Sequence, residues 1–336
     1  MSTSPVLGNV GLGVLSLLLV LFSAWGSLAL YYQLPWSLPV RSLAIAVYAV
    51  FCVACLVGIW RHAAGWSALI YIVSAVLLLS WWWQIKPSNE HDWEDGVAHM
   101  THGVIHGDEV TVYNVRNFAW HSETDYDIRW ETRTYNVNEI KSVDLVLSYW
   151  GMDAIAHAIV SFGFEDGRFL SFSVETRKTK EQEYSSVAGL FKYYGLSIVA
   201  SDERDVIQVR PVYRGEDDYL YRLKIAPDVR KELFLAYIHE ANELAEHPRF
   251  YNTVSGNCTT IVYEMMRHLI QDLPWDYRLL LTGYLPSYIQ EQNGLKGKGD
   301  LAYLKEHGRI TDKAKAAAGR EDFSALIRQG VPGWSK

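Results

Sequence analysis

Charge is nearly missing from the first 83 residues of this 336-residue chain. Arg41 and Arg61 are the charged residues there, so the formal net charge of −7 divides into +2 for this stretch and −9 for the remainder. The chain therefore lacks the strongly basic footprint of nucleic-acid-binding proteins, and we expect no nucleic-acid partner. The uneven composition predicts two regions of different kinds.

Cysteine is also scarce, which excludes a disulfide framework. Cys52 and Cys55 lie in the uncharged stretch, and Cys258 is alone in the remainder. We interpret Cys52 and Cys55 as filler of an apolar helix, because a zinc site would need two further ligands nearby. A lone thiol such as Cys258 is either a buried small side chain or a reactive group.

Three long apolar runs predict membrane-spanning helices at residues 6–32, 42–60 and 66–83. Each run is long enough to cross about 30 Å of hydrocarbon. The first run has no basic segment before it and no small-residue cleavage site after it, so it predicts a retained helix and not a signal peptide. Tryptophans suited to the membrane interface mark the run ends, at 60, 66 and 81–83.

The composition changes at Lys86, where a polar and turn-rich linker begins. We therefore predict a membrane region at 1–85 and one large domain at 86–336. Its strands and helices are mixed without strict alternation, which predicts the α+β class. Alternating segments predict strands at 109–114, 127–135, 142–149, 157–164, 169–177 and 206–212, and helical spacing predicts helices at 180–190, 228–246, 259–271 and 301–307.

Cys258 follows a turn-forming run at 251–257 and precedes a stretch with helical spacing of apolar residues. Asn257 or Ser255 is suited to cap the start of that helix. Cys258 would then lie in the first turn, where the helix dipole lowers the pKa of a thiol. We regard Cys258 as the candidate nucleophile.

Two neighbouring strands carry a row of polar residues. Residues 155–164 place His157 and Ser161 on the face opposite to an apolar row, and residues 169–177 do the same with Ser173 and Glu175. Such sorting marks strands with one face packed and one facing something polar. A turn at 165–168 joins the two strands.

The register of these strands decides which polar residues meet. A two-residue turn would put His157 opposite Thr176, on the wrong face for Glu175. An odd-length loop with Gly167 in a bulge puts His157 opposite Arg177 and diagonal to Glu175. We predict the odd-length loop, because it gathers the apolar residues on one side.

These residues suggest a thiol nucleophile with its base. Cys258 would attack a carbonyl, and His157 would remove the thiol proton and later protonate the leaving group. Glu175 is the predicted third group, with Ser173 and Asn257 as alternatives. Asn257 or the backbone amide of Cys258 would stabilise the oxyanion. The competing interpretation is an inert cysteine and a structural histidine.

Other polar clusters are weaker candidates for a functional site. His99, His102 and His106 have a spacing that metal ligands can use, but Gly103 and Gly107 interrupt the segment. We predict a solvated loop there, with no metal and no cofactor. Residues 202–205 are predicted to form a surface turn. Arg177 is a candidate for binding an anionic group.

A set of motifs resembles one known family over roughly residues 100 to 290. The chain is similar to the bacterial family called the Lnb N-terminal periplasmic domain. The motifs that carry the resemblance are VYNVRNF at 112–118, SYWG at 148–151, AH at 156–157, SFGF at 161–164, SVETR at 173–177, YN at 251–252, NCTT at 257–260 and LTGYLP at 281–286.

The resemblance implies a papain-like, NlpC-type thiol fold in permuted order, with the histidine strand before the cysteine helix. The founding activity resembles an intramolecular lipoprotein transacylase, for which Cys258 would accept the acyl group and His157 would be the base. It implies membrane lipid or lipid-modified protein as the substrate. It also implies a bacterial inner-membrane protein with an extracytoplasmic domain, which the balanced charges of Arg41 and Arg61 do not decide.

Three hypotheses follow. An acyltransferase predicts an apolar groove beside Cys258 that opens toward the membrane. A cell-envelope thiol peptidase or amidase predicts a polar cleft with the same dyad. A catalytically silent membrane protein predicts that Cys258 and His157 lie far apart, since a working pair lies within about 4 Å. Oligomeric state is not indicated by the sequence.

Overall fold

The structure is a computed structural model that describes residues 5–61, 64–270 and 272–334. It contains two compact units. The first comprises the described residues up to Pro87 together with Ser185–Tyr193, and the second comprises Ser88–Tyr184 and the chain from Tyr194 onward. The sequence did not indicate that Ser185–Tyr193 belongs with the membrane helices.

The first unit contains the three predicted membrane helices, α1 (Pro5–Gln33), α2 (Leu38–Trp60) and α3 (Ala64–Gln84). All three are long and apolar enough to cross a bilayer, which confirms the prediction. Polar side chains inside the helix cluster bond to one another, since the Tyr71 hydroxyl lies 2.9 Å from the Ser23 hydroxyl. Such internal pairing satisfies polar groups that lipid cannot.

The segment Ser185–Tyr193 packs on the ends of these helices. Gln33 donates to the carbonyls of Phe191 (2.6 Å) and Lys192 (2.9 Å). The Lys192 ammonium donates to the Trp82 carbonyl at the end of α3 (2.8 Å), where a cation is favoured by the helix dipole. The helix predicted at 180–190 is wrong, because only the short turn η3 (Ala188–Leu190) is helical. The conformation of this segment is set by its contacts with the helix ends, which local helical periodicity does not indicate.

The second unit is built on an eight-stranded sheet, which confirms the α+β class. Its order is β1-β2-β9-β8-β7-β6-β10, with β5 paired to β2, and the pairs are antiparallel except for a short parallel contact of β2 with β9. The strands are β1 (His102–His106), β2 (Glu109–Arg116), β5 (Trp130–Asn136), β6 (Ile140–Tyr149), β7 (Ala156–Phe164), β8 (Phe169–Arg177), β9 (Gly195–Ser201) and β10 (Asp217–Arg222). A separate hairpin pairs β3 (Ala119–Trp120) with β4 (Tyr126–Asp127).

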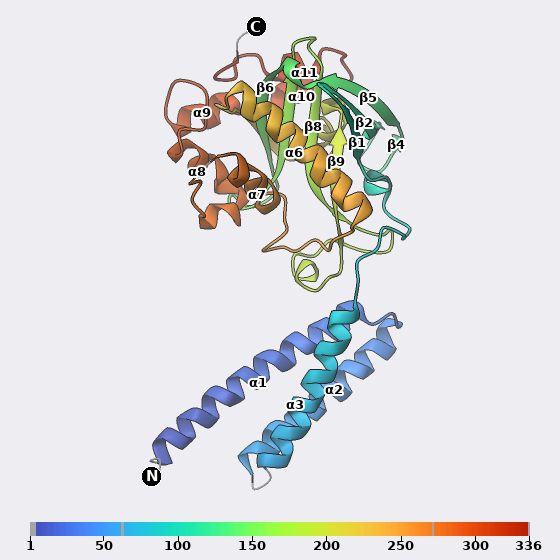
Figure 1. Cartoon of the computed structure of the whole chain (residues 1–336), viewed down its shortest axis with the longest axis vertical. Helices are drawn as coiled ribbons and strands as arrows, with labels where there is room; N and C mark the ends of the chain where they lie inside the picture. The colour runs from blue at the N-terminus through green and yellow to red at the C-terminus, as the bar shows by residue number, and fades with distance from the viewer. Residues whose placement is uncertain (1–4, 62–63, 271, 335–336) are drawn as a thin grey trace. The chain divides into compact units, whose positions relative to one another are not determined.

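One face of the sheet carries the apolar core. Figure 1 shows helix α6 (Pro227–Glu246) lying across this face. The predicted apolar rows of β7 and β8 point toward it, and Phe162 and Phe172 contact the ring of Phe234 with centroids 5.2 and 5.6 Å apart. The predicted strands 157–164 and 169–177 and the helix 228–246 are therefore confirmed.

The other face carries buried polar side chains together with a second apolar cluster that includes Val146 and Ile159 of the sheet. It is covered by α4 (Glu203–Val206), α5 (Val209–Tyr213), α10 (Thr311–Ala316) and α11 (Phe323–Ile327). Arg328 is fully buried there and pairs with Asp144 (2.8 Å) and Glu203 (2.6 Å). The predicted surface turn at 202–205 is wrong, because the carboxylates of Asp202, Glu203 and Asp205 are buried and paired with arginines. The strand predicted at 206–212 is likewise wrong, since this segment forms α4 and α5.

The turn between β7 and β8 has three residues, 165–167. The Phe164 amide donates to the Arg168 carbonyl (3.0 Å), and Gly167 has a φ of +86°. The predicted odd-length loop is confirmed. The ladder pairs Ile159 with Ser173, so its continuation places His157 opposite Glu175. The predicted pairing of His157 with Arg177 is wrong by two residues, because the loop closes at Phe164.

Candidate active site

Cys258 is presented by a tightly bonded loop before helix α7 (Thr260–Leu269). The Asn257 side-chain oxygen accepts from the amides of Thr259 and Thr260, both at 2.9 Å. These bonds hold the start of α7, but the N-cap position is Thr259, so the predicted cap at Asn257 or Ser255 is wrong and Cys258 lies just before the first turn. The thiol is nevertheless fixed beside the positive end of the helix dipole. The predicted helix at 259–271 is confirmed as α7, although residue 271 lies outside the described residues.

The structure brings Cys258 and His157 together across about a hundred residues of sequence. Cys258 is half-buried, and its thiol contacts the His157 imidazole and the backbone N–H of Ala158 and lies 3.9 Å from the Thr259 hydroxyl. The pairing of β7 with β8 ends at Ile159, whereas its pairing with β6 continues to Ala156. The separated end of β7 therefore offers a backbone donor to the thiol instead of to β8.

A serine hydroxyl connects His157 to Glu175. The His157 Nε2 atom lies 2.6 Å from the Ser173 hydroxyl and 3.1 Å from the Glu175 carboxylate. The Ser173 hydroxyl donates its single hydrogen to Glu175, so its oxygen accepts from the protonated Nε2. This arrangement leaves Nδ1 as the ring nitrogen that can take the thiol proton.

The same contacts set the protonation states of the site. Burial alone would lower the pKa of His157, but the Glu175 carboxylate and the bond with Cys258 outweigh it and raise that pKa to about 9. Burial alone would raise the pKa of Cys258, but the bond with His157, its charge and the Ala158 amide lower it below its ordinary value. Both shifts favour transfer of the thiol proton to the imidazole.

Glu175 is the anionic end of this chain of groups. Burial would raise the pKa of its carboxyl, but His157, Arg210 and the Ser173 hydroxyl outweigh burial and hold that pKa far below its usual range. Glu175 is therefore ionised at every pH at which the thiol is reactive. The third group predicted from the sequence is in contact with the base, and Ser173, the predicted alternative, lies between them.

A buried polar cluster that the sequence did not indicate lies beside His157. Ser148, the cross-strand neighbour of His157, contacts the carboxyl groups of Glu216 and Asp218 through its hydroxyl. Arg210 pairs with Glu216 at 2.8 Å. The positive charge of Arg210 favours the ionised form of Glu175 and opposes the charged form of His157. Burial raises the pKa of Asp218 to about 7.

The two predicted oxyanion donors, the Asn257 side chain and the Cys258 backbone amide, differ in their hydrogen bonds. The Asn257 side-chain amide donates to the Thr253 carbonyl (2.9 Å), so both ends of this side chain are engaged in the loop. Within the part of the chain that the structure describes, the Cys258 backbone N–H has no hydrogen-bond acceptor. Of the two predicted oxyanion donors, the backbone amide is therefore the one with an available hydrogen.

Arg177 lies away from this chemistry. Its guanidinium donates to the carbonyls of Val97 and Ala98, both at 2.9 Å, and stacks 4.4 Å from the Trp93 ring. The side chain is buried, and it holds the segment that leads into the sheet. These contacts favour a structural role over the predicted binding of an anionic group.

The histidines at 99, 102 and 106 do not form a loop as predicted, since His102 and His106 begin and end strand β1. The His102 ring stacks on Tyr113 with centroids 4.9 Å apart, which explains its place in the sheet. Among the described residues, no group of three potential ligands is arranged to hold a metal ion.

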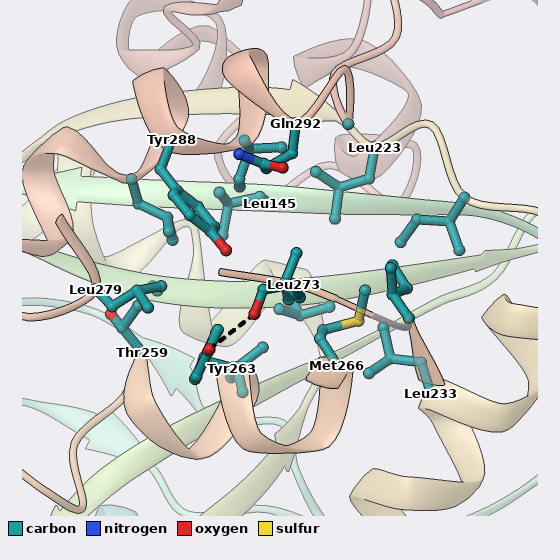
Figure 2. A pocket seen from close by; sticks show the side chains of 18 of the residues that line it. Leu145, Leu223, Leu233, Thr259, Tyr263, Met266, Leu273, Leu279, Tyr288 and Gln292 are labelled. Carbon is teal, nitrogen blue, oxygen red and sulfur yellow. Dashed lines mark hydrogen bonds between the residues drawn. The ribbon is translucent and has the colours of Figure 1, made fainter. Parts of the chain in front are cut away.

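Cys258 opens onto a largely apolar pocket of about 260 Å³. Figure 2 shows Tyr263 and Met266 of α7 on one side, and Tyr288 of α8 (Leu285–Glu291) on the other, with Leu145 of β6 between them. The Tyr263 hydroxyl donates to the Leu273 carbonyl (3.0 Å) and the Tyr288 hydroxyl to the Pro274 carbonyl (2.7 Å). Both phenols are thus satisfied, and their rings present apolar surface.

Comparison with known families agrees with this picture. Residues 126–283 match the model of the family described as the Lnb N-terminal periplasmic domain, which confirms the resemblance over this range. The matched range contains His157, Ser173, Glu175 and Cys258. Neither curated proteins nor solved structures gave a match. Together with the three apolar helices, the family match supports a membrane protein with a periplasmic domain.

Proposed function

We propose that this protein is a membrane-anchored, cysteine-dependent acyltransferase that carries its acyl group as a thioester on Cys258. The observation that supports this function is the shared position of the reactive thiol: it contacts His157 and also lines an apolar pocket. An apolar pocket suits a fatty acyl chain, whereas a peptidase would need polar groups along its cleft to bind a peptide backbone.

In the first half-reaction the Cys258 thiolate attacks the ester carbonyl of an acylated glyceryl group. The Cys258 backbone amide donates to the developing oxyanion. The bond from the carbonyl carbon to the glyceryl oxygen then breaks, and the imidazolium of His157 gives its proton to that oxygen. The products of this step are the thioester and a free glyceryl hydroxyl.

In the second half-reaction an amine takes the acyl group. The resemblance implies that this amine belongs to the terminal cysteine of the same lipoprotein. It attacks the thioester carbonyl, neutral His157 removes the amine proton, and the Cys258 thiolate leaves. Glu175 and Ser173 hold the His157 ring in one orientation through both steps, because they keep Nε2 protonated.

We further propose that the fold is the papain-like arrangement in permuted order. Its support is the topology of the site: a histidine from a central antiparallel strand meets a cysteine at the start of a helix that comes later in the chain. The family match covers both elements. In the usual order of papain-like enzymes the cysteine helix precedes the histidine strand.

A diacyl lipopeptide with an isotope-labelled ester-linked chain tests this function. The full-length protein in detergent should move the label to the peptide amine, giving a product of unchanged mass that mass-spectrometric fragmentation distinguishes from the substrate. A variant with Cys258→Ala should form none, whereas Cys52→Ala is the matched control and should remain active. Release of labelled free fatty acid, or cleavage of the peptide bond, would identify a hydrolase instead.

A further inference from the structure

Exposed apolar side chains gather on two segments of the second unit. Trp275, Tyr277 and Met152 are 63%, 58% and 60% exposed, although each is large and apolar. We use the name aromatic rim for the set Trp150, Met152, Trp275, Tyr277, Leu281 and Tyr284. Ile155, at 36% exposure, lies in the same segment as Met152, whereas exposed apolar side chains such as Val104, Ile128 and Tyr303 are scattered over separate elements. Scattered side chains are ordinary, whereas a gathered patch indicates an interaction surface.

The two segments of the aromatic rim form one surface. The Gly283 amide donates to the Ala154 carbonyl (3.1 Å), and the Tyr149 hydroxyl donates to the Gly283 carbonyl (2.7 Å). A Cβ atom at Gly283 would lie 1.9 Å from the Asp153 carbonyl oxygen, so only glycine permits this approach. The loop between β6 and β7 is therefore fixed against the chain between α7 and α8.

The aromatic rim is continuous with the candidate active site. Leu279 and Leu285 belong to the same stretch of chain as Tyr277 and Tyr284, and both line the pocket beside Cys258. The Thr282 hydroxyl lies 2.7 Å from the hydroxyl of Thr259, the residue that follows the nucleophile. Whatever the rim binds is therefore held next to the pocket.

The charges within the rim segments indicate the kind of partner. Residues 150–155 and 272–284 contain three aspartates and one arginine. That arginine, Arg278, is paired with Asp276 (2.7 Å) and Glu291 (2.6 Å). The rim therefore offers no excess of positive charge for anionic headgroups. Its tryptophans and tyrosines are the residues that favour the boundary between lipid tails and headgroups.

We propose that the aromatic rim docks into the interfacial layer of a bilayer of zwitterionic lipids and holds the Cys258 pocket at the lipid surface. The second unit is covalently joined to three membrane helices, so a bilayer is its permanent neighbour. This inference deepens the proposed function, because it supplies the acyl substrate from the membrane. The docking itself is measured without any acyl transfer.

Photocrosslinking in nanodiscs of phosphatidylcholine tests the docking with the full chain. p-Benzoylphenylalanine is placed singly at Trp275 and Tyr277, with positions Ile128 and Tyr303 as controls that are also exposed on other elements (53% and 44%). We expect lipid adducts at 275 and 277 at least tenfold above those at the controls. Equal adducts at all four positions, or adducts to a second protein copy at the rim, would overturn the proposal.

The same samples separate this proposal from the proposed function. Thioester formation at Cys258 is measured in them with a labelled lipopeptide. Adducts at the rim without a thioester would support docking and contradict acyl transfer, whereas a thioester without rim adducts would contradict docking alone. The double variant Trp275→Ser and Tyr277→Ser should lower turnover of membrane-embedded lipopeptide about tenfold and leave iodoacetamide labelling of Cys258 unchanged, which shows that the site is still folded.

Discussion

The three cysteines lie in two environments, and burial alone does not explain why we expect a reactive thiol in one of them and inert thiols in the other. Cys52 and Cys55 are buried in the helix cluster beside Tyr71, with 6% and 7% exposure. Cys258 is half-buried at the start of α7, where it contacts His157 and the Ala158 amide. Polar partners that stabilise a thiolate distinguish Cys258, whereas Cys52 and Cys55 lie among apolar side chains and tyrosines of the helix cluster.

The largest expected difference between the two environments is in acyl transfer. Cys258→Ser should lower kcat/KM by about 10³-fold or more, because nucleophile and base act as a unit. The double variant Cys52→Ser and Cys55→Ser should keep most of the activity, since neither thiol contacts a base. Rates with the labelled lipopeptide check this. Comparable losses of activity in both variants would contradict a special role for Cys258.

Removing the base should make Cys258 resemble an ordinary thiol. His157→Gln removes both the hydrogen bond and the positive charge that lower the pKa of Cys258, so that pKa should rise. Iodoacetamide labelling at pH 7 should slow by roughly tenfold, with its midpoint displaced to higher pH. Peptide mass spectrometry reads out labelling at Cys258, and unchanged labelling would mean that the dipole of α7 alone activates the thiol.

Glu175→Gln tests the partner of His157, the residue that distinguishes Cys258 from the other two cysteines. The pKa of His157 is raised from 6.5 to about 9, so its stabilising contribution is complete below 6.5 and is lost as the pH rises through 9. Loss of the carboxylate should lower the pKa of His157 and remove on the order of 3 kcal/mol of this pH-dependent stability. Melting temperatures in detergent between pH 6 and pH 10 measure it, and an unchanged pH profile would contradict the assignment. Ser173→Ala should give a smaller change in the same direction.

The smallest expected effect concerns the pocket. Met266→Trp should fill part of the space beside Cys258 and lower turnover of long-chain substrates several-fold relative to short-chain ones, because added volume excludes the chain. Leu269→Trp, on the same helix but outside the pocket lining, is the control. If both variants lose long and short chains equally, the acyl chain binds elsewhere.

Local pattern predicted the parts of the site that depend on nearby sequence. Alternation placed His157 and Glu175 on one face of two paired strands, and turn chemistry predicted the loop at Gly167. The cap sequence placed Cys258 at a helix start. The register was wrong by two residues because the sequence of the turn does not specify which pair closes it.

Contacts between distant segments could not be predicted in this way. Residues 206–212 alternate like a strand, yet the preceding Asp202 side chain accepts from the Arg204 amide (2.9 Å) and starts a helix. Glu203 is held there by Arg328, which lies 125 residues later in the chain. The cluster of Ser148, Arg210 and Glu216 beside the base depends on this fold and has no local signal.

Trapping the acyl-enzyme tests the central claim most directly. Membranes containing the full chain are incubated with a labelled diacyl lipopeptide, and the protein is digested and analysed before and after neutral hydroxylamine, which cleaves thioesters and spares oxygen esters. We predict that the Cys258 peptide carries label that hydroxylamine removes, and that the Cys258→Ser protein carries no hydroxylamine-sensitive label. Equal hydroxylamine-sensitive label on both proteins would contradict a covalent role for Cys258.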